Sequence, residues 1–132
     1  MAHLAGLGLG ADVASSIVMT GPGKRADELA AAVAAGIRAV TVESLGELGR
    51  LERIAIAADA DRRQPVMLRA AVSDVARLER VRLVGDDGAG KFGMDAADLV
   101  VAAGLAARSP ALDLVGVHAF GASNVLDAAA LV

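Results

Sequence analysis

Residues 114–123 read Leu114-Val-Gly-Val-His-Ala-Phe-Gly-Ala-Ser123. An apolar run that ends in a histidine and a glycine-serine turn is typical of a buried strand followed by a loop with polar groups. His118 then stands near the carboxyl end of a strand, where barrel enzymes place their working residues. A lone histidine on an apolar strand is also common as a hydrogen-bonded core residue, so this position alone leaves both interpretations open.

The turn after this run favours a phosphate site. Gly121, Ala122 and Ser123 are small, and a helical pattern starts at Asn124–Val132. Backbone N–H groups at a helix N-terminus, with a serine hydroxyl beside them, suit a phosphate group. Arg69 ends another apolar run and needs an anionic partner, because an unpaired charge on a buried strand is costly.

Composition bounds the size and class of the protein. At 132 residues the chain forms one domain at most, over 1–132, and is long enough to bury a core. Hydrophobic residues make up 55% of the chain, but aromatic residues only 2%, all of them phenylalanine. This combination predicts small-residue helices packed closely on a sheet.

Composition and charge also exclude several functional classes. A net charge of −3, without a basic run interleaved with aromatic residues, argues against a nucleic-acid partner. The absence of cysteine excludes disulfides, a thiolate nucleophile and a cysteine zinc site. Nothing near His3 or His118 has the spacing of metal ligands, so we expect no metal site.

The N-terminal stretch is apolar but short. Residues 1–10 lack a basic leading region, and Asp12 ends the apolar run early. The stretch therefore fits neither a signal peptide nor a membrane span. We expect no membrane association and a cytoplasmic location.

Five apolar runs without clean alternation predict parallel strands buried on both faces. They are Leu9–Ala14, Ile17–Thr20, Ala39–Glu43, Pro65–Val72 and Leu112–Phe120. Helical patterns cover Arg25–Ala35, Leu45–Ala58 and Ala96–Ala107, and another starts at Asn124–Val132. Strands that alternate with helices indicate an α/β fold with right-handed crossovers, either a doubly wound sheet or part of a (β/α) barrel.

Two features limit a barrel interpretation. A complete barrel takes about 250 residues, and five strands are fewer than the eight that it needs. Only Ser15 and Ser16 separate the first two runs, although a parallel crossover needs about a dozen residues or more. Either these runs form one strand, or a helix has been lost between them. Residues 73–84 fit a short helix or an irregular strand, and residues 86–90 have the composition of a loop.

The helix boundaries have readable signals. Asp27 and Glu28 fall in a first turn, where the helix dipole favours anions. Gly36 is placed to end that helix in the left-handed conformation. Ser44 and Glu47 have the spacing of a capping box at the start of the next helix.

Two glycine motifs are weak. The run Gly6-Leu-Gly-Leu-Gly-Ala11 matches a dinucleotide-binding pattern but has too few residues before it for the required strand. The run Gly21-Pro-Gly-Lys24 is similar to the end of a phosphate-binding loop, but Val18 and Arg25 depart from that pattern. We interpret it as a strand-to-helix turn with an exposed lysine.

Six blocks in order resemble one known family, the fold-type III pyridoxal-phosphate (PLP) decarboxylases of the diaminopimelate/ornithine type. The blocks are Gly10-Ala-Asp-Val-Ala-Ser15, Ile17-Val-Met-Thr-Gly-Pro-Gly-Lys24, Val40-Thr-Val-Glu-Ser44 with Glu47-Leu48, Val66-Met-Leu-Arg69, Lys91-Phe-Gly-Met94 and Leu114 to Ser123. The resemblance covers nearly all of the chain. It implies a partial (β/α) TIM-type barrel of the alanine racemase/decarboxylase kind, with about five parallel strands, that binds PLP.

The resemblance implies a set of cofactor-binding residues. Asp12 matches the acidic residue near the cofactor, and Arg69 matches the strand-end arginine near the ring hydroxyl of PLP. Ser123 matches a serine that helps to hold the phosphate. Many relatives have two histidines in the last block, the second of which stacks on the pyridine ring. Here His118 matches the first, and Phe120 replaces the second as a neutral aromatic face.

The resemblance also implies that catalytic residues are missing. The strand with the Schiff-base lysine corresponds to a position before Met1, and neither Lys24 nor Lys91 matches it. The remaining strands and the C-terminal domain of the family correspond to positions after Val132. PLP chemistry runs through a lysine imine, so we expect no covalent attachment and no activity from this chain alone.

The family implies an amino acid as small-molecule substrate and loss of its carboxylate as CO₂. A racemase or PLP-carrier relative shares the barrel, but Lys91-Phe-Gly93 and the glycine-x-histidine block favour the decarboxylases. The alternative is a non-catalytic fragment that associates with itself or with a complete relative, because open strand edges pair readily. A homo-oligomer is expected in either case.

Overall fold

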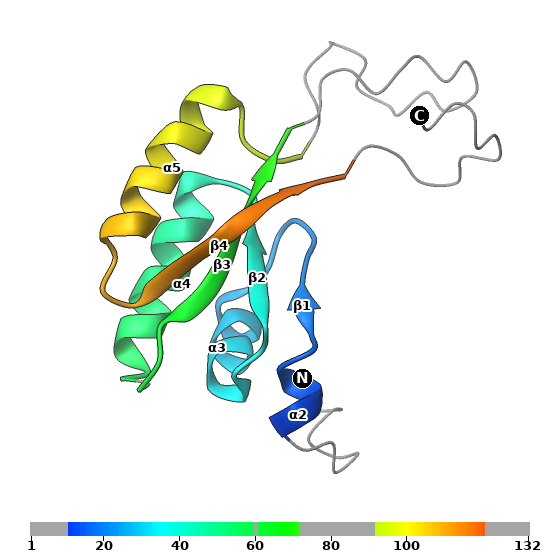
Figure 1. Cartoon of the computed structure of the whole chain (residues 1–132), viewed down its shortest axis with the longest axis vertical. Coiled ribbons are helices and arrows are strands. Elements are labelled where there is room, and N and C mark those ends of the chain that lie inside the picture. The colour runs from blue at the N-terminus through cyan, green and yellow to red at the C-terminus, as the bar shows by residue number, and fades with distance from the viewer. Residues whose placement is uncertain (1–10, 60, 72–91, 121–132) are drawn as a thin grey trace, which may run out of the picture.

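The computed structural model describes residues 11–59, 61–71 and 92–120, which form a parallel sheet with helices on one face (Figure 1). The strands are β1 (Val18–Met19), β2 (Ala39–Val42), β3 (Gln64–Ala70) and β4 (Leu112–Ala119). The helices are α2 (Ala11–Ala14), α3 (Ala26–Ala35), α4 (Leu45–Ala57) and α5 (Ala96–Arg108).

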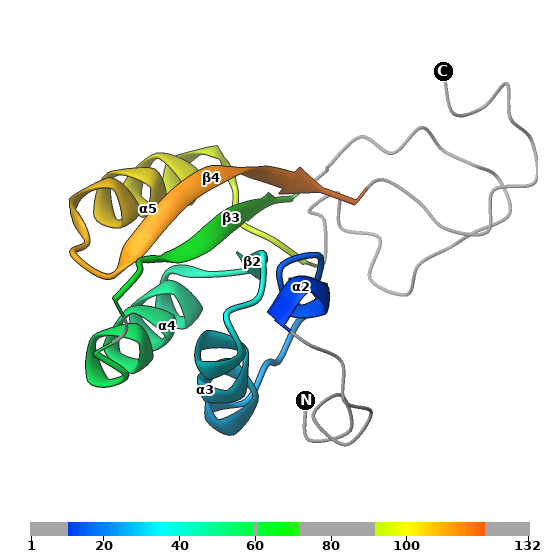
Figure 2. The same ribbon diagram turned by 60° about the horizontal axis from the view of Figure 1, so that its bottom comes forward.

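The order of the strands decides between the two α/β architectures. The sheet has the order β1-β2-β3-β4, and all neighbouring pairs are parallel. The helices α3, α4 and α5 all lie on the same side of it (Figure 2). A doubly wound sheet reverses its strand order and has helices on both faces, whereas a (β/α) barrel does neither. The prediction of a partial TIM-type barrel is therefore confirmed.

One predicted strand is wrong. The run Leu9–Ala14 was expected to be a strand, but Ala11–Ala14 forms helix α2, at the amino end of β1 (Figure 1). Ser16 N–H bonds to Val13 O, and Ile17 N–H bonds to Ala14 O, so the chain turns before β1 instead of continuing as a strand. The explanation that the two runs form one strand therefore fails. A short apolar run has no periodicity that separates strand from helix, and four strands rather than five are present in the described residues.

The predicted limits of the three long helices agree with the structure to within one residue. Gly36 ends α3 in the left-handed conformation, with φ 67° and ψ 39°. At the start of α3, the Arg25 guanidinium donates to the Asp27 carboxylate, which lowers the pKa of Asp27 and raises that of Arg25. Both side chains are exposed, so this pair adds little stability.

The start of α4 differs from a standard capping box. Ser44 Oγ accepts from Glu47 N–H at 3.2 Å, as predicted. The Glu47 carboxylate, however, accepts from the backbone N–H of Glu43 at 2.8 Å rather than from that of Ser44. Glu47 thus bonds to the end of strand β2 and not only to its own helix.

Replacing Ser44 with alanine should lower the free energy of unfolding by about 1 kcal/mol, because α4 loses the side-chain acceptor for one of its first N–H groups. Urea unfolding followed by circular dichroism measures this change. Ser44→Asp keeps an acceptor at the same place and should retain wild-type stability. Equal losses in both variants would contradict a capping role.

The core lies between the sheet and the three long helices. Its members are almost fully buried and mostly small or branched: Leu29, Ala32, Val33, Ile37, Val40, Val42, Leu48, Leu51, Ala55, Val66, Leu68, Met94, Ala102, Ala106 and Leu112. The alanines of α3, α4 and α5 allow a close approach of helix to sheet, which confirms the expectation of small-residue packing.

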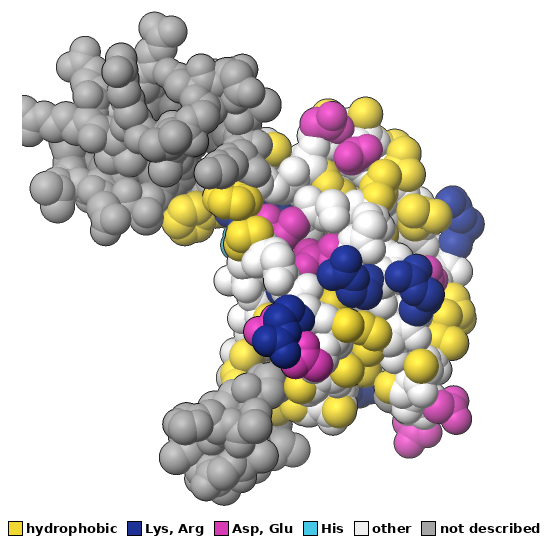
Figure 3. Space-filling view, turned by 180° about the vertical axis from the view of Figure 1, so that it is seen from behind, with side chains coloured by type: hydrophobic (Ala, Val, Ile, Leu, Met, Phe, Trp, Pro, Cys, Tyr) yellow, Lys and Arg dark blue, Asp and Glu magenta, His cyan; other side chains and the backbone are white. Residues whose placement is uncertain are grey.

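The second face of the sheet corresponds to the inside of a barrel. Val66 and Leu68 belong to the core, so the alternate residues Met67 and Arg69 point to the opposite face. Gly116 pairs with Met67, and a Cβ on this glycine would lie 3.6 Å from Met67 Cε, so both residues are on that face. The outer side of the molecule has basic and acidic side chains interspersed with apolar ones over the described residues (Figure 3).

Candidate functional site

Three strand ends bring charged and polar side chains into one row. Arg69 of β3 pairs in register with His118 of β4. Val42, the last residue of β2, pairs with Leu68, so Glu43 follows it beside Arg69. Paired residues of parallel strands point to the same face, so Glu43, Arg69 and His118 line the barrel side of the sheet at its carboxyl end.

Arg69 and Glu43 form a largely buried ion pair. Arg69 Nη1 donates to Glu43 Oε1 at 2.7 Å, and the two side chains are only 11% and 10% exposed. Sequence reasoning required an anionic partner for Arg69, and the chain itself supplies it. The pair holds the guanidinium in one orientation. A guanidinium has five N–H groups, so Arg69 can also donate to a further acceptor.

Two phenylalanine rings lie against the Arg69 guanidinium. Its central carbon is 5.6 Å from the centroid of Phe92 and 5.8 Å from that of Phe120, within the range of cation–π contact. Phe120 follows β4, and Phe92 precedes α5. Both rings remain about half exposed, so they form an apolar border around a charged centre.

The backbone conformation of Gly93 allows Phe92 to lie beside the Arg69 guanidinium. Gly93 has φ +97°, and a Cβ on it would lie 2.8 Å from the backbone of Ala70 and Ala71. The close approach lets Met94 N–H bond to Arg69 O and Ala71 N–H bond to Met94 O, both at 2.8 Å. Residues 92–94 therefore extend the sheet beside β3 beyond the last residue of β2.

Two polar atoms of this row are buried without a partner among the described residues. They are Nδ1 of His118 and Oε2 of Glu43. A buried polar atom that makes no hydrogen bond costs about 1–3 kcal/mol, and such atoms in native proteins usually meet water or a ligand. The row at the carboxyl end therefore has, on each side of Arg69, a buried polar atom with no hydrogen-bond partner among the described residues.

The predicted cofactor residues fall into two groups. Arg69, His118 and Phe120 come together at this edge. Asp12 is in α2, with its side chain outside the described residues, and Ser123 lies outside them altogether, as do Lys91 and residues 73–84, 86–90 and 124–132. The sequence analysis missed two members of the site.

Glu43 and Phe92 are those two members. Glu43 ends a buried strand with a charge, the same signal that singled out Arg69, so it could have been found. Phe92 had no comparable signal, because its place depends on the turn at Gly93.

The prediction that Lys24 is exposed is wrong. The turn at residues 21–23 does connect a strand to a helix, with positive φ at Gly21 and Gly23. Lys24, however, is only 4% exposed, where an exposed lysine was expected. Its ammonium donates to Gly21 O at 2.6 Å and lies 3.2 Å from Glu47 Oε2, and this pairing allows the charge to be buried.

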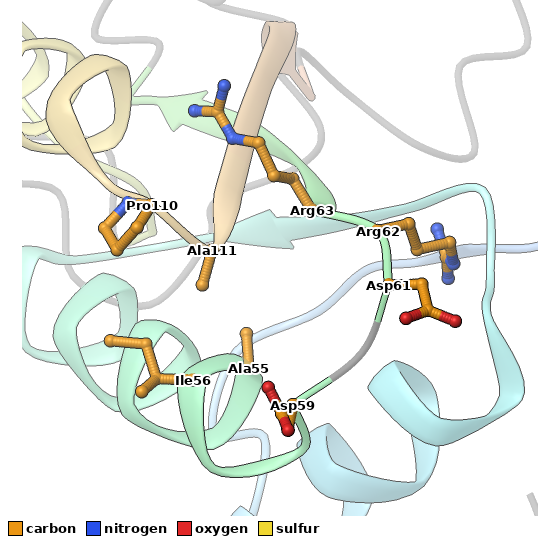
Figure 4. A pocket seen from close by; sticks show the side chains of 8 residues that line it. All are labelled: Ala55, Ile56, Asp59, Asp61, Arg62, Arg63, Pro110 and Ala111. Atoms are coloured by element: carbon orange, nitrogen blue, oxygen red, sulfur yellow. The ribbon is translucent and has the colours of Figure 1, made fainter.

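A separate cavity lies at the opposite end of the sheet (Figure 4). It measures about 290 Å³ and is bounded by the end of α4 and the segments that enter β3 and β4. Arg63 extends its guanidinium away from Asp59 and Asp61 in Figure 4 and donates to Ser109 O at 3.0 Å. Barrel enzymes work at the carboxyl ends of their strands, so we place the functional site at the row of Arg69 instead.

The described part of the chain has neither a metal-ligand cluster nor a membrane-spanning helix. Within residues 11–59, 61–71 and 92–120 there is no group of three or more histidine, cysteine or acidic side chains able to hold a metal ion. No helix in these ranges is long and apolar enough to cross a bilayer.

Helices on one face of a parallel sheet in sequential strand order define part of a (β/α) barrel, with polar side chains at the carboxyl ends of its strands. Comparison with known proteins gives the family. Residues 4–132 match the family model described as "Pyridoxal-dependent decarboxylase, pyridoxal binding domain". The chain belongs to this family, which confirms the resemblance seen in the six sequence blocks and with it PLP as the cofactor of the family.

Two curated relatives and two solved structures are similar to the chain. A 2-[(L-alanin-3-ylcarbamoyl)methyl]-2-hydroxybutanedioate decarboxylase of Staphylococcus aureus is 35% identical over 91% of this chain and 29% of its own length. A diaminopimelate decarboxylase of Neisseria meningitidis is 29% identical over 98% of this chain and 34% of its own.

Diaminopimelate decarboxylases from M. jannaschii and Helicobacter pylori, each solved with L-lysine, both superpose with a TM-score of 0.73. They are 25% and 27% identical and cover 96% and 86% of this chain, but each match spans 28% of the relative. The chain therefore spans about a third or less of the relatives that it matches.

The described residues fit the ring of a pyridoxal group. The Arg69 guanidinium has further N–H groups besides the one bonded to Glu43, and Nδ1 of His118 has no hydrogen-bond partner among the described residues. The rings of Phe92 and Phe120 form an apolar border. These are the features that a flat heteroaromatic ring with a hydroxyl substituent requires. The turn expected to hold the phosphate lies outside the described residues.

Proposed function

We propose that this chain is the cofactor-binding barrel part of a PLP-dependent amino-acid decarboxylase, similar to diaminopimelate decarboxylase. The observation that supports this best is the row of Glu43, Arg69 and His118 at the carboxyl end of the sheet. Two buried atoms of this row have no hydrogen-bond partner in the part of the chain that the structure describes. Bound PLP would withdraw electrons from the substrate while its carboxylate leaves as CO₂.

Each residue has a definite proposed role. Arg69, held by Glu43, would donate a hydrogen bond to the hydroxyl oxygen on the cofactor ring, and His118 and Phe120 would border the ring. Asp12 and Ser123 contribute near the ring and the phosphate respectively, on the strength of the family pattern alone. The two relatives solved with L-lysine support an amino acid as substrate. A cytoplasmic location and a homo-oligomer complete the proposal.

We further propose that the 132 residues alone bind the cofactor without a covalent bond and do not decarboxylate. The contacts of Lys24 support this. Its ammonium is buried and committed to Gly21 O and the Glu47 carboxylate, and a nucleophilic amine would have to leave both. Lys91 lies outside the described residues, so the experiment must test it directly.

PLP should bind to the chain saturably, and borohydride reduction should leave no stoichiometric lysyl adduct. Equilibrium dialysis measures the binding, and peptide mass spectrometry measures adducts at Lys24 and Lys91. Arg62→Ala alters only the opposite end of the sheet and should bind PLP as the wild type does. A wild-type chain that binds no PLP would refute the cofactor role, and a stoichiometric adduct at either lysine would refute noncovalent binding.

One observation favours self-association as a second function. Val115 and Val117 of β4 are 52% and 62% exposed, and this strand has no neighbour on its outer edge among the described residues. Exposed apolar edge strands pair with other chains. Sedimentation velocity at several concentrations tests the idea, and a compact monomer at all of them would exclude it.

A further inference from the structure

Lys24 and Glu47 form a buried ion pair that the proposed cofactor contacts do not use. Lys24 is 4% exposed and Glu47 7%, and the Lys24 ammonium lies 3.3 Å and 3.2 Å from the two carboxylate oxygens. Arg50 holds the backbone of Lys24 as well, through a bond from Nη1 to Lys24 O at 3.2 Å. A buried pair of this kind is weak evidence for stability, since apolar residues often replace one without loss.

The pair connects directly to the candidate site. Glu47 Oε2, which pairs with Lys24, also accepts from the backbone N–H of Glu43 at 2.8 Å. The side chain of Glu43 is the partner of Arg69 at 2.7 Å. Two contacts at Glu47 and one ion pair at Glu43 thus join the loop after β1 to the guanidinium at the end of β3.

We propose that Glu47, its buried carboxylate neutralised by Lys24, is a positioning residue for the cofactor site, acting through Glu43 on Arg69. The inference rests on the proposed PLP-binding function. Lys24 neutralises Glu47 and keeps its carboxylate buried against the strand end. Without that cation, the carboxylate turns toward water, and the Glu43 N–H loses its acceptor. The end of β2 then relaxes, and the Glu43 carboxylate no longer orients Arg69.

Two double variants separate positioning from simple ion pairing. Lys24→Met with Glu47→Gln removes both charges but keeps an amide oxygen as acceptor for the Glu43 N–H. Lys24→Met with Glu47→Leu removes both charges and the acceptor. Both avoid an unpaired buried charge, so both should fold, and they differ only in the bond to Glu43.

The probe is pyridoxine 5′-phosphate, which has no aldehyde and so cannot react with lysines. Its dissociation constant should stay within about threefold of wild type in the Gln variant and rise about tenfold or more in the Leu variant, the loss expected for one charge-assisted hydrogen bond. Equal affinities in the two folded variants would overturn the proposal.

Amide hydrogen exchange provides a readout that does not depend on ligand. Glu43 N–H should stay protected in the Gln variant and exchange faster in the Leu variant, and rotation of the Arg69 guanidinium should become faster only in the latter. If wild type binds no pyridoxine phosphate, the proposed function fails, and exchange alone then decides whether Glu47 positions Glu43 and Arg69. Unchanged exchange at Glu43 in the Leu variant would refute the positioning role.

Discussion

Arg69→Met should lower the free energy of unfolding by about 3–5 kcal/mol and abolish measurable PLP binding. The substitution leaves the Glu43 carboxylate 10% exposed and without its cation, and an uncompensated buried charge has a cost of this size. It also removes the cation that contacts Phe92 and Phe120. Urea unfolding and equilibrium dialysis with PLP measure the two effects.

The matched variant combines Arg69→Met with Glu43→Leu. Removing both charges should restore most of the lost stability, because no buried charge remains unpaired, while PLP binding stays absent. Arg53→Ala removes an arginine at an exposed position on α4 and is the control for losing a positive charge outside the site. If the single and double variants were equally unstable, packing rather than charge pairing would explain the loss.

Gly93→Ala should destabilise the protein by about 3 kcal/mol or more, through backbone strain added to a steric clash. The new Cβ would lie 2.8 Å from backbone atoms of Ala70 and Ala71, which cannot move aside as a flexible side chain can. Relief of the clash breaks the two bonds of Met94 to β3 and moves Phe92 away from Arg69. Thermal unfolding measures the loss.

Gly21→Ala is the control for this prediction. Gly21 has a similar φ of +100°, but nothing lies within 4 Å of a Cβ built there. This variant therefore has only the conformational strain, on the order of 1–3 kcal/mol. If Gly93→Ala lowers the stability no more than Gly21→Ala does, the close approach of Gly93 to the backbone at the end of β3 does not contribute to stability.

The parts of the fold that could be predicted depend on local signals. The helices α3, α4 and α5 have long amphipathic patterns, and Gly36 and Ser44 have local roles at helix ends, so their limits followed from neighbouring residues alone. Helix α2 could not be recognised in the same way. Four small apolar residues have no period, and backbone bonds to Ser16 and Ile17 decide their conformation.

The candidate site was predictable only in part. Arg69 and His118 lie at the ends of apolar runs, and their sequence positions placed them correctly at the edge of the sheet. The partners of these residues come from far along the chain, because Glu43 precedes Arg69 by 26 positions and Lys24 precedes Glu47 by 23. No local pattern encodes such contacts.

The amino-acid sequence was enough to predict parallel α/β structure and, through six ordered motifs, the pyridoxal-binding family and its barrel. It also placed Arg69 and His118 at the carboxyl ends of strands. These properties follow from hydrophobic runs, capping residues and ordered motifs, all of which are local in the chain. Tertiary packing alone determined that Lys24 is buried, that Glu43 neutralises Arg69 and that Phe92 reaches the guanidinium. The burial of a charge depends on the partner that the fold brings to it, and that partner is set by strand register and by the close approach at Gly93.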